Sequence, residues 1–361
     1  MTARPAGLWG AMLLVVMPLL AWAGQPTRIT PTAASPLATA SELVERQFGP
    51  LRAFQIQAKL HTLGLEHTSR IKLADERMLV RVPDKTGANG RYGLLVFLDS
   101  RPQARYDVEW NNALDSHGLI FVSPDNAGDD AAAFDRRIPL ALDAYEYARQ
   151  TYQLDPDRIY IAGDAGGSLV AHSLAVSYPD VFSGAIVNAG ALELGTPALP
   201  APSPELLQRL RTHSRLVFAA SSHDEPAFTQ QRRTLKSLSA YCAPVGQVFE
   251  NGHVITGHAV INGLFLNDFI HALDAPPRAG TTDQATCEAN LARDARSSLA
   301  TIRQLDAGGR HDEALKSLVA FDNAYGRLFL DDAVALVKQV NPAFFSTSAA
   351  PASDPAPAAA H

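Results

Sequence analysis

The chain is 361 residues long, with 47% apolar and 19% charged residues, which is enough for one large hydrophobic core. Its formal net charge of −6 gives no electrostatic reason to expect nucleic acid or an anionic membrane surface as a partner. The sequence has no internal repeat of solenoid period, which argues against a repeat architecture.

The first 23 residues have the organisation of a cleaved signal peptide. Arg4 supplies the positive charge, Leu8 to Leu20 is apolar, and Ala21-Trp22-Ala23 before Gly24 forms a small-x-small cleavage site. The apolar run is short for a membrane span, and no cysteine follows it for lipid attachment. We therefore expect an exported protein, periplasmic or extracellular, with no membrane span after signal cleavage.

Two further segments have compositions that form poor cores. Residues 24–40 are rich in Pro, Thr, Ala and Ser, and residues 346–361 are rich in Ala and Pro. Such compositions predict a flexible leader and a disordered tail.

Apolar runs alternate with amphipathic stretches throughout residues 41–275. The predicted strands are 77–82, 93–98, 118–122, 159–162, 184–187, 216–220 and 245–249. The predicted helices between them include 138–151, 168–177, 228–241 and 260–273. Runs that are apolar throughout fit strands buried on both faces, and their alternation with helices predicts a doubly wound, mostly parallel α/β sheet.

The pattern changes to helices alone in residues 284–345. Helices are predicted at 287–305, 311–320 and 331–340, and the first two are joined at Gly308-Gly309-Arg310. That turn resembles the turn of a tetratricopeptide unit, but one unit is too short for a solenoid. The sequence therefore predicts a small C-terminal helical extension that packs on the main domain or offers a surface to a protein partner.

The clearest motif lies at the corner between strand 159–162 and helix 168–177. The sequence Gly163-Asp164-Ala165-Gly166-Gly167 has the layout of a nucleophile elbow, Gly-x-Ser-x-Gly. In that motif, glycines permit a strained turn that lifts the central side chain above the sheet. Here the central residue is Ala165, and a methyl group does not attack a carbonyl.

The elbow and its flanks resemble one family. Residues 155–163 and 178–185 are similar to the Asp-Pro-x-Arg-Ile-Tyr strand and the Tyr-Pro-Asp-x-Phe-x-Gly turn of the polyhydroxybutyrate depolymerase and feruloyl esterase branch of the α/β-hydrolase family. The similarity spans residues 70–275 and is strong between 155 and 190. It implies an α/β-hydrolase-like sheet and carries over Gly163, Gly166 and Gly167, but the nucleophile is replaced by Ala165.

The resemblance also implies positions for the other catalytic groups, because the family order is nucleophile, acid, histidine. Asp224, after strand 216–220, takes the place of the acid; it is otherwise a solvated loop residue. His258, in Gly257-His258-Ala259, takes the place of the general base, with His253 as its competitor. The oxyanion hole would use the backbone N–H of Gly166 and one near Ser100 or Arg101.

Two residues are alternative nucleophiles at the corner. Asp164 would attack as a carboxylate if the motif were shifted by one position, although Gly163 and Gly167 would then lose their roles. Ser168 lies one turn further on, where its hydroxyl more readily satisfies a backbone group at the helix start. Near the same corner, Tyr106 and Trp110 either line the cleft or pack in the core.

Cys242 and Cys287 are the two cysteines of the chain. In an oxidising compartment they are candidates for one disulfide, and the alternative is two free buried thiols. His253 and His258 have no third ligand nearby, so no metal site and no cofactor are predicted.

The sequence leaves three functions open. The first is an exported hydrolase homologue without a nucleophile, a pseudo-esterase that binds an ester-like or acyl ligand or a protein partner. The second is an active carboxylic-ester hydrolase that uses Asp164 or another nucleophile. The third is an interaction protein that works through its C-terminal helices. Fold analogy alone does not choose among them.

Overall fold

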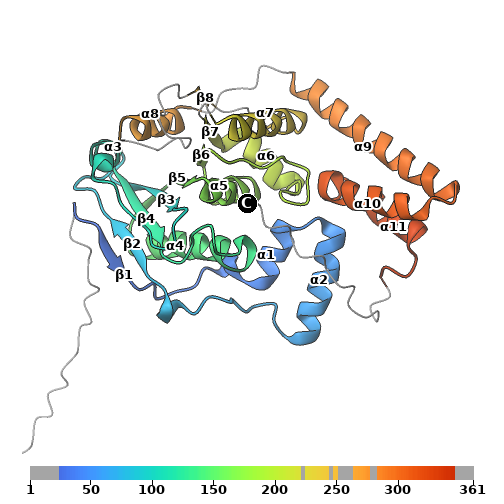
Figure 1. The fold of residues 1–361 in the computed structure, drawn as a ribbon, viewed down its shortest axis with the longest axis horizontal. Coiled ribbons are helices and arrows are strands. Elements are labelled where there is room, and N and C mark those ends of the chain that lie inside the picture. Colours follow the sequence, from blue (N-terminus) through green and yellow to red (C-terminus); the bar gives the residue numbers. More distant parts are fainter. Residues whose placement is uncertain (1–23, 221–223, 244–246, 251–262, 277–282, 346–361) are drawn as a thin grey trace, which may run out of the picture.

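A computed structural model describes residues 24–220, 224–243, 247–250, 263–276 and 283–345. Within these residues, eight strands form one sheet in the order β1-β2-β4-β3-β5-β6-β7-β8 (Figure 1). The antiparallel pairs are β1 with β2 and β2 with β4, and the remaining neighbours are parallel. The strands are β1 (Thr27–Ile29), β2 (Met78–Arg81), β3 (Tyr92–Leu98), β4 (Leu119–Pro124), β5 (Leu154–Asp164), β6 (Gly184–Asn188), β7 (Arg215–Ala220) and β8 (Gln247–Glu250).

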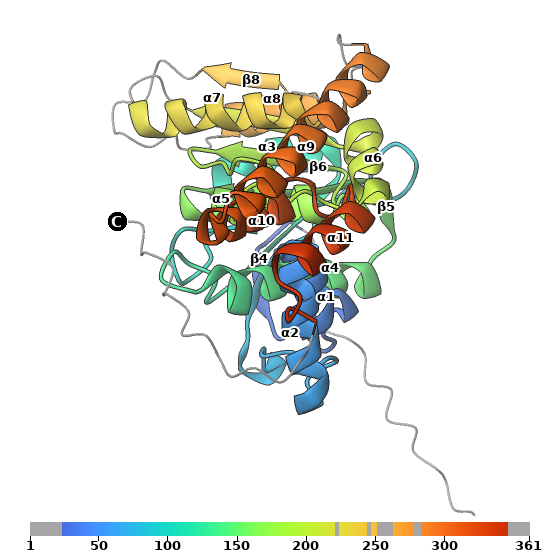
Figure 2. The same ribbon diagram turned by 90° about the vertical axis from the view of Figure 1, so that its right-hand side faces the viewer.

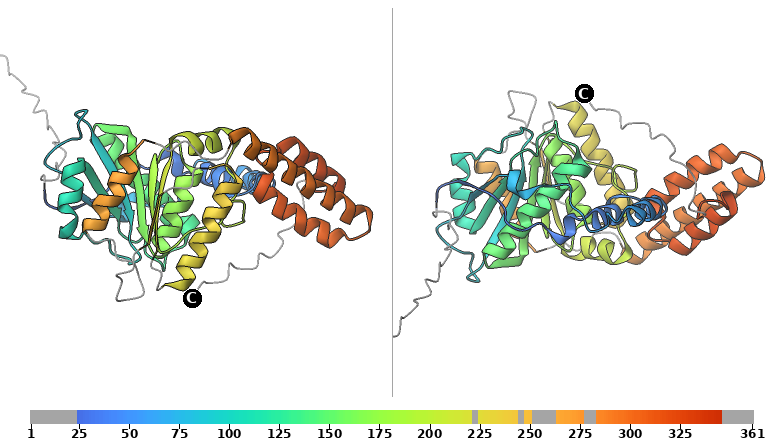
Figure 3. Two further views of the ribbon diagram at one scale, coloured as in Figure 1. Left: turned by 90° about the horizontal axis from the view of Figure 1, so that it is seen from above. Right: turned by 90° about the horizontal axis from the view of Figure 1, so that it is seen from below.

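The central strands are apolar throughout because the sheet is covered on both faces. In β3, Leu94, Val96 and Leu98 enter one hydrophobic cluster, while Leu95 and Phe97 enter another on the opposite face. Helices α4, α5, α6 and α7 contribute to the first cluster, and α3 and α8 contribute to the second (Figure 3). The fold is therefore an α/β-hydrolase-like, doubly wound, mostly parallel sheet with a C-terminal helical extension, as the sequence predicts.

The described residues also form eleven α-helices. They are α1 (Ala40–Gln47), α2 (Pro50–Leu63), α3 (Asn111–His117), α4 (Ile138–Thr151), α5 (Gly166–Ser177), α6 (Pro204–His213), α7 (Glu225–Ala240), α8 (Gly263–Asp274), α9 (Gln284–Ala307), α10 (His311–Tyr325) and α11 (Leu330–Val340). Across the described part of the chain, no helix has both the length and the apolar content to span a membrane.

Residues 24–40 are part of the folded domain, so the prediction of a flexible leader is wrong for them. Strand β1 pairs with β2, the Gly24 amide donates to the Val82 carbonyl at 2.9 Å, and the Ser35 amide donates to Asp143 at 2.7 Å. Hydrogen bonds from its backbone to the sheet and to Asp143 of α4 hold this segment, and composition does not register such bonds.

The helical extension shares its core with the N-terminal part of the chain. Leu51 of α2 lies in one hydrophobic cluster with Leu299 of α9, Phe321 of α10 and Leu336 of α11. Figure 2 shows α2 beside α10 and α11. The helical unit thus comprises α2 together with α9, α10 and α11. The predicted domain boundary placed α2 in the sheet domain, whereas its core residue Leu51 packs in the helical unit.

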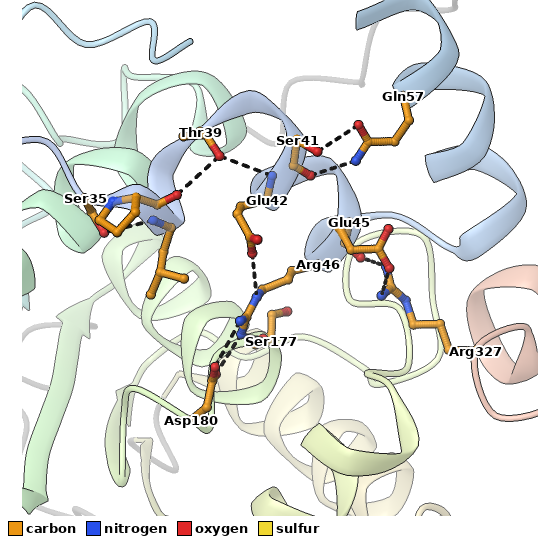
Figure 4. Close-up of polar contacts among 12 residues, drawn as sticks. Ser35, Thr39, Ser41, Glu42, Glu45, Arg46, Gln57, Ser177, Asp180 and Arg327 are labelled. Atoms are coloured by element: carbon orange, nitrogen blue, oxygen red, sulfur yellow. Dashed lines mark hydrogen bonds and ion pairs between the residues drawn. The ribbon is translucent and has the colours of Figure 1, made fainter. Parts of the chain in front are cut away.

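Helix α1 joins the sheet domain to this helical unit (Figure 4). The Arg46 guanidinium makes two hydrogen bonds to the Asp180 carboxylate, at 2.7 and 2.9 Å, and its carbon lies 4.5 Å from the Tyr178 ring centre. On the other side, Arg327 donates to the backbone carbonyls of Glu45 and Phe48. The two contacts hold α1 between the end of α5 and the loop after α10.

Candidate functional site

The corner between β5 and α5 has the strained backbone of a nucleophile elbow. Ala165 lies between Asp164, the last residue of β5, and Gly166, the first residue of α5, with φ 51° and ψ −118°. A positive φ is unfavourable for a residue with a Cβ atom, at a cost of about 1–3 kcal/mol. The turn therefore keeps the conformation that presents an apex side chain, and that side chain is the methyl group of Ala165.

Two glycines make this turn possible through close backbone approach. A Cβ atom at Gly163 would lie 2.3 Å from the carbonyl carbon of Gly167, and one at Gly167 would lie 2.1 Å from the carbonyl oxygen of Leu98. Both distances are far below contact, so α5 packs against β5 and β3 only because these side chains are absent.

The Asp164 carboxylate is tied to the neighbouring strand. Its Oδ1 accepts a hydrogen bond from Asn188 Nδ2 at 2.8 Å, and Asn188 is also its partner in the β5–β6 ladder. Asp164 lines a cavity of about 400 Å³ beside the elbow. The other residues that line it are Phe97, Asp99, Arg101, Arg105, Tyr106, Asp107, Val108 and Trp110.

Aromatic side chains both line this cavity and belong to the core. Trp110 is 6% exposed and packs edge-on against Phe97, with ring centres 5.0 Å apart. Tyr106 is half-buried, and its hydroxyl donates to Asn111 Oδ1 at 2.6 Å. The two uses that the sequence leaves open for Tyr106 and Trp110 therefore occur together.

The Ser168 hydroxyl is not at the apex. It is fully buried, and its Oγ donates to the carbonyl oxygen of Gly190 at 2.6 Å. Because Gly190 follows β6, this bond joins the start of α5 to the next loop. The Ser168 hydroxyl proton is therefore donated to a backbone carbonyl. A serine nucleophile would instead donate it to a general base.

The acid and base positions are only partly described. Asp224 is the N-cap of α7, and its Oδ1 accepts from the Ala227 amide at 3.2 Å. His253 and His258 lie in the connection between β8 and α8, outside the described residues. The structure thus gives Asp224 a capping contact and does not test its approach to an imidazole.

The backbone donors expected in the oxyanion hole already bind carboxylates of the chain. The Gly166 amide donates to Asp129 Oδ2 at 3.4 Å, and the Arg101 amide donates to Asp99 Oδ1 at 3.0 Å. The Ser100 carbonyl accepts from the Asp129 amide at 2.8 Å. Sequence reasoning missed Asp129, because it lies 37 residues before Gly166 in the loop after β4.

A buried histidine lies on α5 behind the elbow. His172 is fully buried, its Nδ1 accepts from the Leu192 amide at 3.0 Å, and its ring lies edge-on to Phe218. Burial lowers its pKa from 6.5 to about 3, so the ring is neutral at physiological pH. A neutral, enclosed imidazole at this place supports the packing of α5 and does not face the cavity.

The structure brings Cys242 and Cys287 together in a disulfide, with an S–S distance of 2.04 Å. The bond joins Cys242, two residues after the end of α7, to Cys287 in the first turn of α9. It therefore connects the sheet domain to the helical unit.

No family model matches the chain. A segment of 65 residues is 34% identical to an acetylxylan esterase of Coprinopsis cinerea, and the match spans 17% of each chain. A solved esterase of Pyrobaculum calidifontis is 13% identical, with a TM-score of 0.42 over 55% of this chain and 80% of that one. The S-formylglutathione hydrolase of Staphylococcus aureus is 14% identical, with a TM-score of 0.41 over 55% of this chain and 91% of that one.

Proposed function

We propose that this protein is an exported pseudo-esterase: a hydrolase-fold protein that does not cleave esters and binds an ester-like or acyl ligand, or a protein partner, at the mouth of the sheet. The observation that carries the proposal is Ala165 at the apex of an elbow whose strain is retained. In a serine hydrolase the apex hydroxyl forms the acyl intermediate, and a methyl group has no lone pair with which to do so.

The cavity next to Asp164 is the site we propose for such a ligand. Its volume of about 400 Å³ is within the range of small-molecule sites, and its wall combines aromatic rings with carboxylates and guanidinium groups. The apolar rings would hold an acyl chain or an aromatic acid, while the Arg101 guanidinium would bind a polar group of the ligand.

Export is supported by the signal-peptide organisation of residues 1–23 and by the disulfide of the mature part. The Cys242–Cys287 disulfide is typical of an oxidising compartment. Intact mass of the protein recovered from the periplasm or medium tests this: a chain that starts at Gly24 is expected, and a chain that retains Met1 contradicts it.

The absence of turnover is tested on the purified mature protein. Short p-nitrophenyl esters should be hydrolysed no faster than in buffer, and a serine-directed fluorophosphonate should leave the protein unlabelled. Labelling that accompanies turnover would reveal a serine nucleophile and contradict the proposal. Binding of the same esters is measured by calorimetry, with Tyr106→Ala as the variant expected to lose it.

A second function is favoured by the place of Asp164 in the cavity wall. If this carboxylate attacks a carboxylic ester directly, the wild type turns over without fluorophosphonate labelling, and Asp164→Asn abolishes the activity. Asp130→Asn, at an exposed position, is the matched control. The Asn188 hydrogen bond to Oδ1 weakens this candidate, because it lowers the nucleophilicity of that oxygen.

A further inference from the structure

We propose that Asp129 blocks the oxyanion position, so that the site is closed to an ester carbonyl independently of the missing nucleophile. This inference rests on the proposed function, because it explains how a hydrolase site comes to exclude its own reaction. Asp129 then decides which ligands the site accepts. It keeps carbonyl and carboxylate oxygens away from the Gly166 amide, so that a ligand binds only in the neighbouring cavity lined by Asp164.

The contact is close enough to exclude another group. Asp129 Oδ2 accepts the Gly166 amide at 3.4 Å, and a Cβ atom built on Gly166 would lie 2.3 Å from Asp129 Oδ1. The carboxylate therefore lies directly over the first residue of α5. In an elbow of this kind the amide after the apex residue binds the oxyanion, and that residue here is Gly166.

Asp129 is held in this position from two further sides. Its Oδ1 accepts Arg137 Nη2 at 3.0 Å, and its amide donates to the Ser100 carbonyl at 2.8 Å. Arg137 is itself buried, and its Nε donates to the Ala127 carbonyl at 2.9 Å. The preceding Gly128 packs so closely that a Cβ atom there would lie 2.6 Å from the carbonyl carbon of Arg101.

The chemistry of acyl transfer explains why this arrangement prevents catalysis. Attack on an ester places negative charge on the carbonyl oxygen, and the oxyanion hole stabilises it with N–H donors. A carboxylate at that place uses the donor and repels the developing charge. Loss of one such donor costs about 10²–10³ in kcat. The Arg101 amide, the second candidate donor, is engaged by Asp99 in the same way.

A serine at position 165 should therefore be silent until Asp129 is removed. We would compare Ala165→Ser with the double variants Ala165→Ser/Asp129→Ala and Ala165→Ser/Asp130→Ala on p-nitrophenyl acetate. Asp129 is 44% exposed, and Asp130 is an exposed neighbour of equal charge. Because Asp129 also pairs with the buried Arg137, urea unfolding of each variant is measured to show that the fold is kept. We expect the Asp129 double variant to exceed the other two by about 100-fold or more. Equal and measurable activity in all three would overturn the inference.

A second measurement decides the case in which all three variants are inactive. In protein labelled with ¹⁵N-glycine, Asp129→Ala should move the Gly166 amide proton upfield, because its acceptor is lost, and Asp130→Ala should not. Added acetate should reverse the shift in Asp129→Ala and have no effect on the wild type. An unchanged Gly166 resonance in Asp129→Ala refutes the block. Ester turnover by the wild type would refute the proposed function instead, so the two failures are distinct.

Discussion

Asp322 of α10 accepts the backbone amide of Leu51 at the start of α2, at 2.9 Å and across 271 residues of sequence. Its second oxygen accepts the Arg52 amide at 3.3 Å, so one carboxylate caps a helix that belongs to the other end of the chain. A Cβ atom at Gly49 would lie 2.4 Å from this carboxylate, which explains the glycine before α2. The C-terminal helices thus complete an element of the N-terminal part.

Replacing Asp322 by Ala should therefore destabilise the whole protein. The variant leaves the first amides of α2 without an acceptor, and the cost of losing such a cap is about 1–2 kcal/mol. The measurement is the free energy of unfolding in urea. Lys316→Ala, at an exposed position of the same helix, is the control and should change it little.

Acid should weaken the contact between β5 and α8. Asp274 accepts hydrogen bonds from His117, Arg158 and Tyr160. Burial would raise the pKa of Asp274, but these three donors together hold it at about 2. Because the folded pKa lies below the unfolded value, the stabilisation is complete above about pH 4 and is lost as the pH falls towards 2.

After a discount for solvent screening, the contribution of Asp274 is on the order of 1–2 kcal/mol. Urea unfolding at a series of acidic pH values should show this loss in the wild type and not in Asp274→Asn. The control is Asp268→Asn on the exposed side of α8. If Asp274→Asn keeps the acid dependence of the wild type, the assignment to Asp274 is wrong.

His172 gives a second pH dependence, in a higher range. Burial lowers its pKa to about 3, while the unfolded chain binds that proton near pH 6.5. Stability should therefore fall as the pH drops below about 6.5, by up to about 1.4 kcal/mol per pH unit for one proton. His172→Gln keeps an acceptor for the Leu192 amide and should remove this slope, whereas the exposed His271→Gln should retain it. Thermal unfolding between neutral and mildly acid pH distinguishes the two.

The disulfide should contribute strongly to stability. Cys242 and Cys287 are 45 residues apart, and closing a loop of that length restricts the unfolded chain by about 4 kcal/mol in the loop-entropy treatment. The variant with both cysteines replaced by Ser should unfold at a lower urea concentration than the wild type. A reductant should lower the unfolding midpoint of the wild type towards that of the variant. If oxidised and reduced wild type unfold at the same urea concentration, the bond is not a stabilising link.

The sheet could be predicted because its strands carry a strong local signal. Each central strand is an apolar run with both faces buried, and helix α4 has the bounds 138–151 that its amphipathic pattern predicts. Strand β1 and helix α2 gave no such signal. The first is held by backbone pairing, and the second buries its residues against helices more than 200 residues away.

The elbow could also be predicted, since its glycines lie in one short motif. The contacts that decide what the elbow does are distant in sequence. Asp129 approaches Gly166 from the loop after β4, and the Ser168 hydroxyl bonds to the carbonyl after β6. A motif names the residues of the turn, whereas these partners depend on how the loops at the strand ends pack together.

The shared core of α2 with α9, α10 and α11 has a consequence for how this protein could be divided. A chain that ends after Asp274 would expose Leu51 and the rest of the inner face of α2 to water, together with the uncapped start of that helix. The terminal helices are therefore not a detachable module. Any attempt to transplant them onto another protein, or to trim them away, must take α2 along with them.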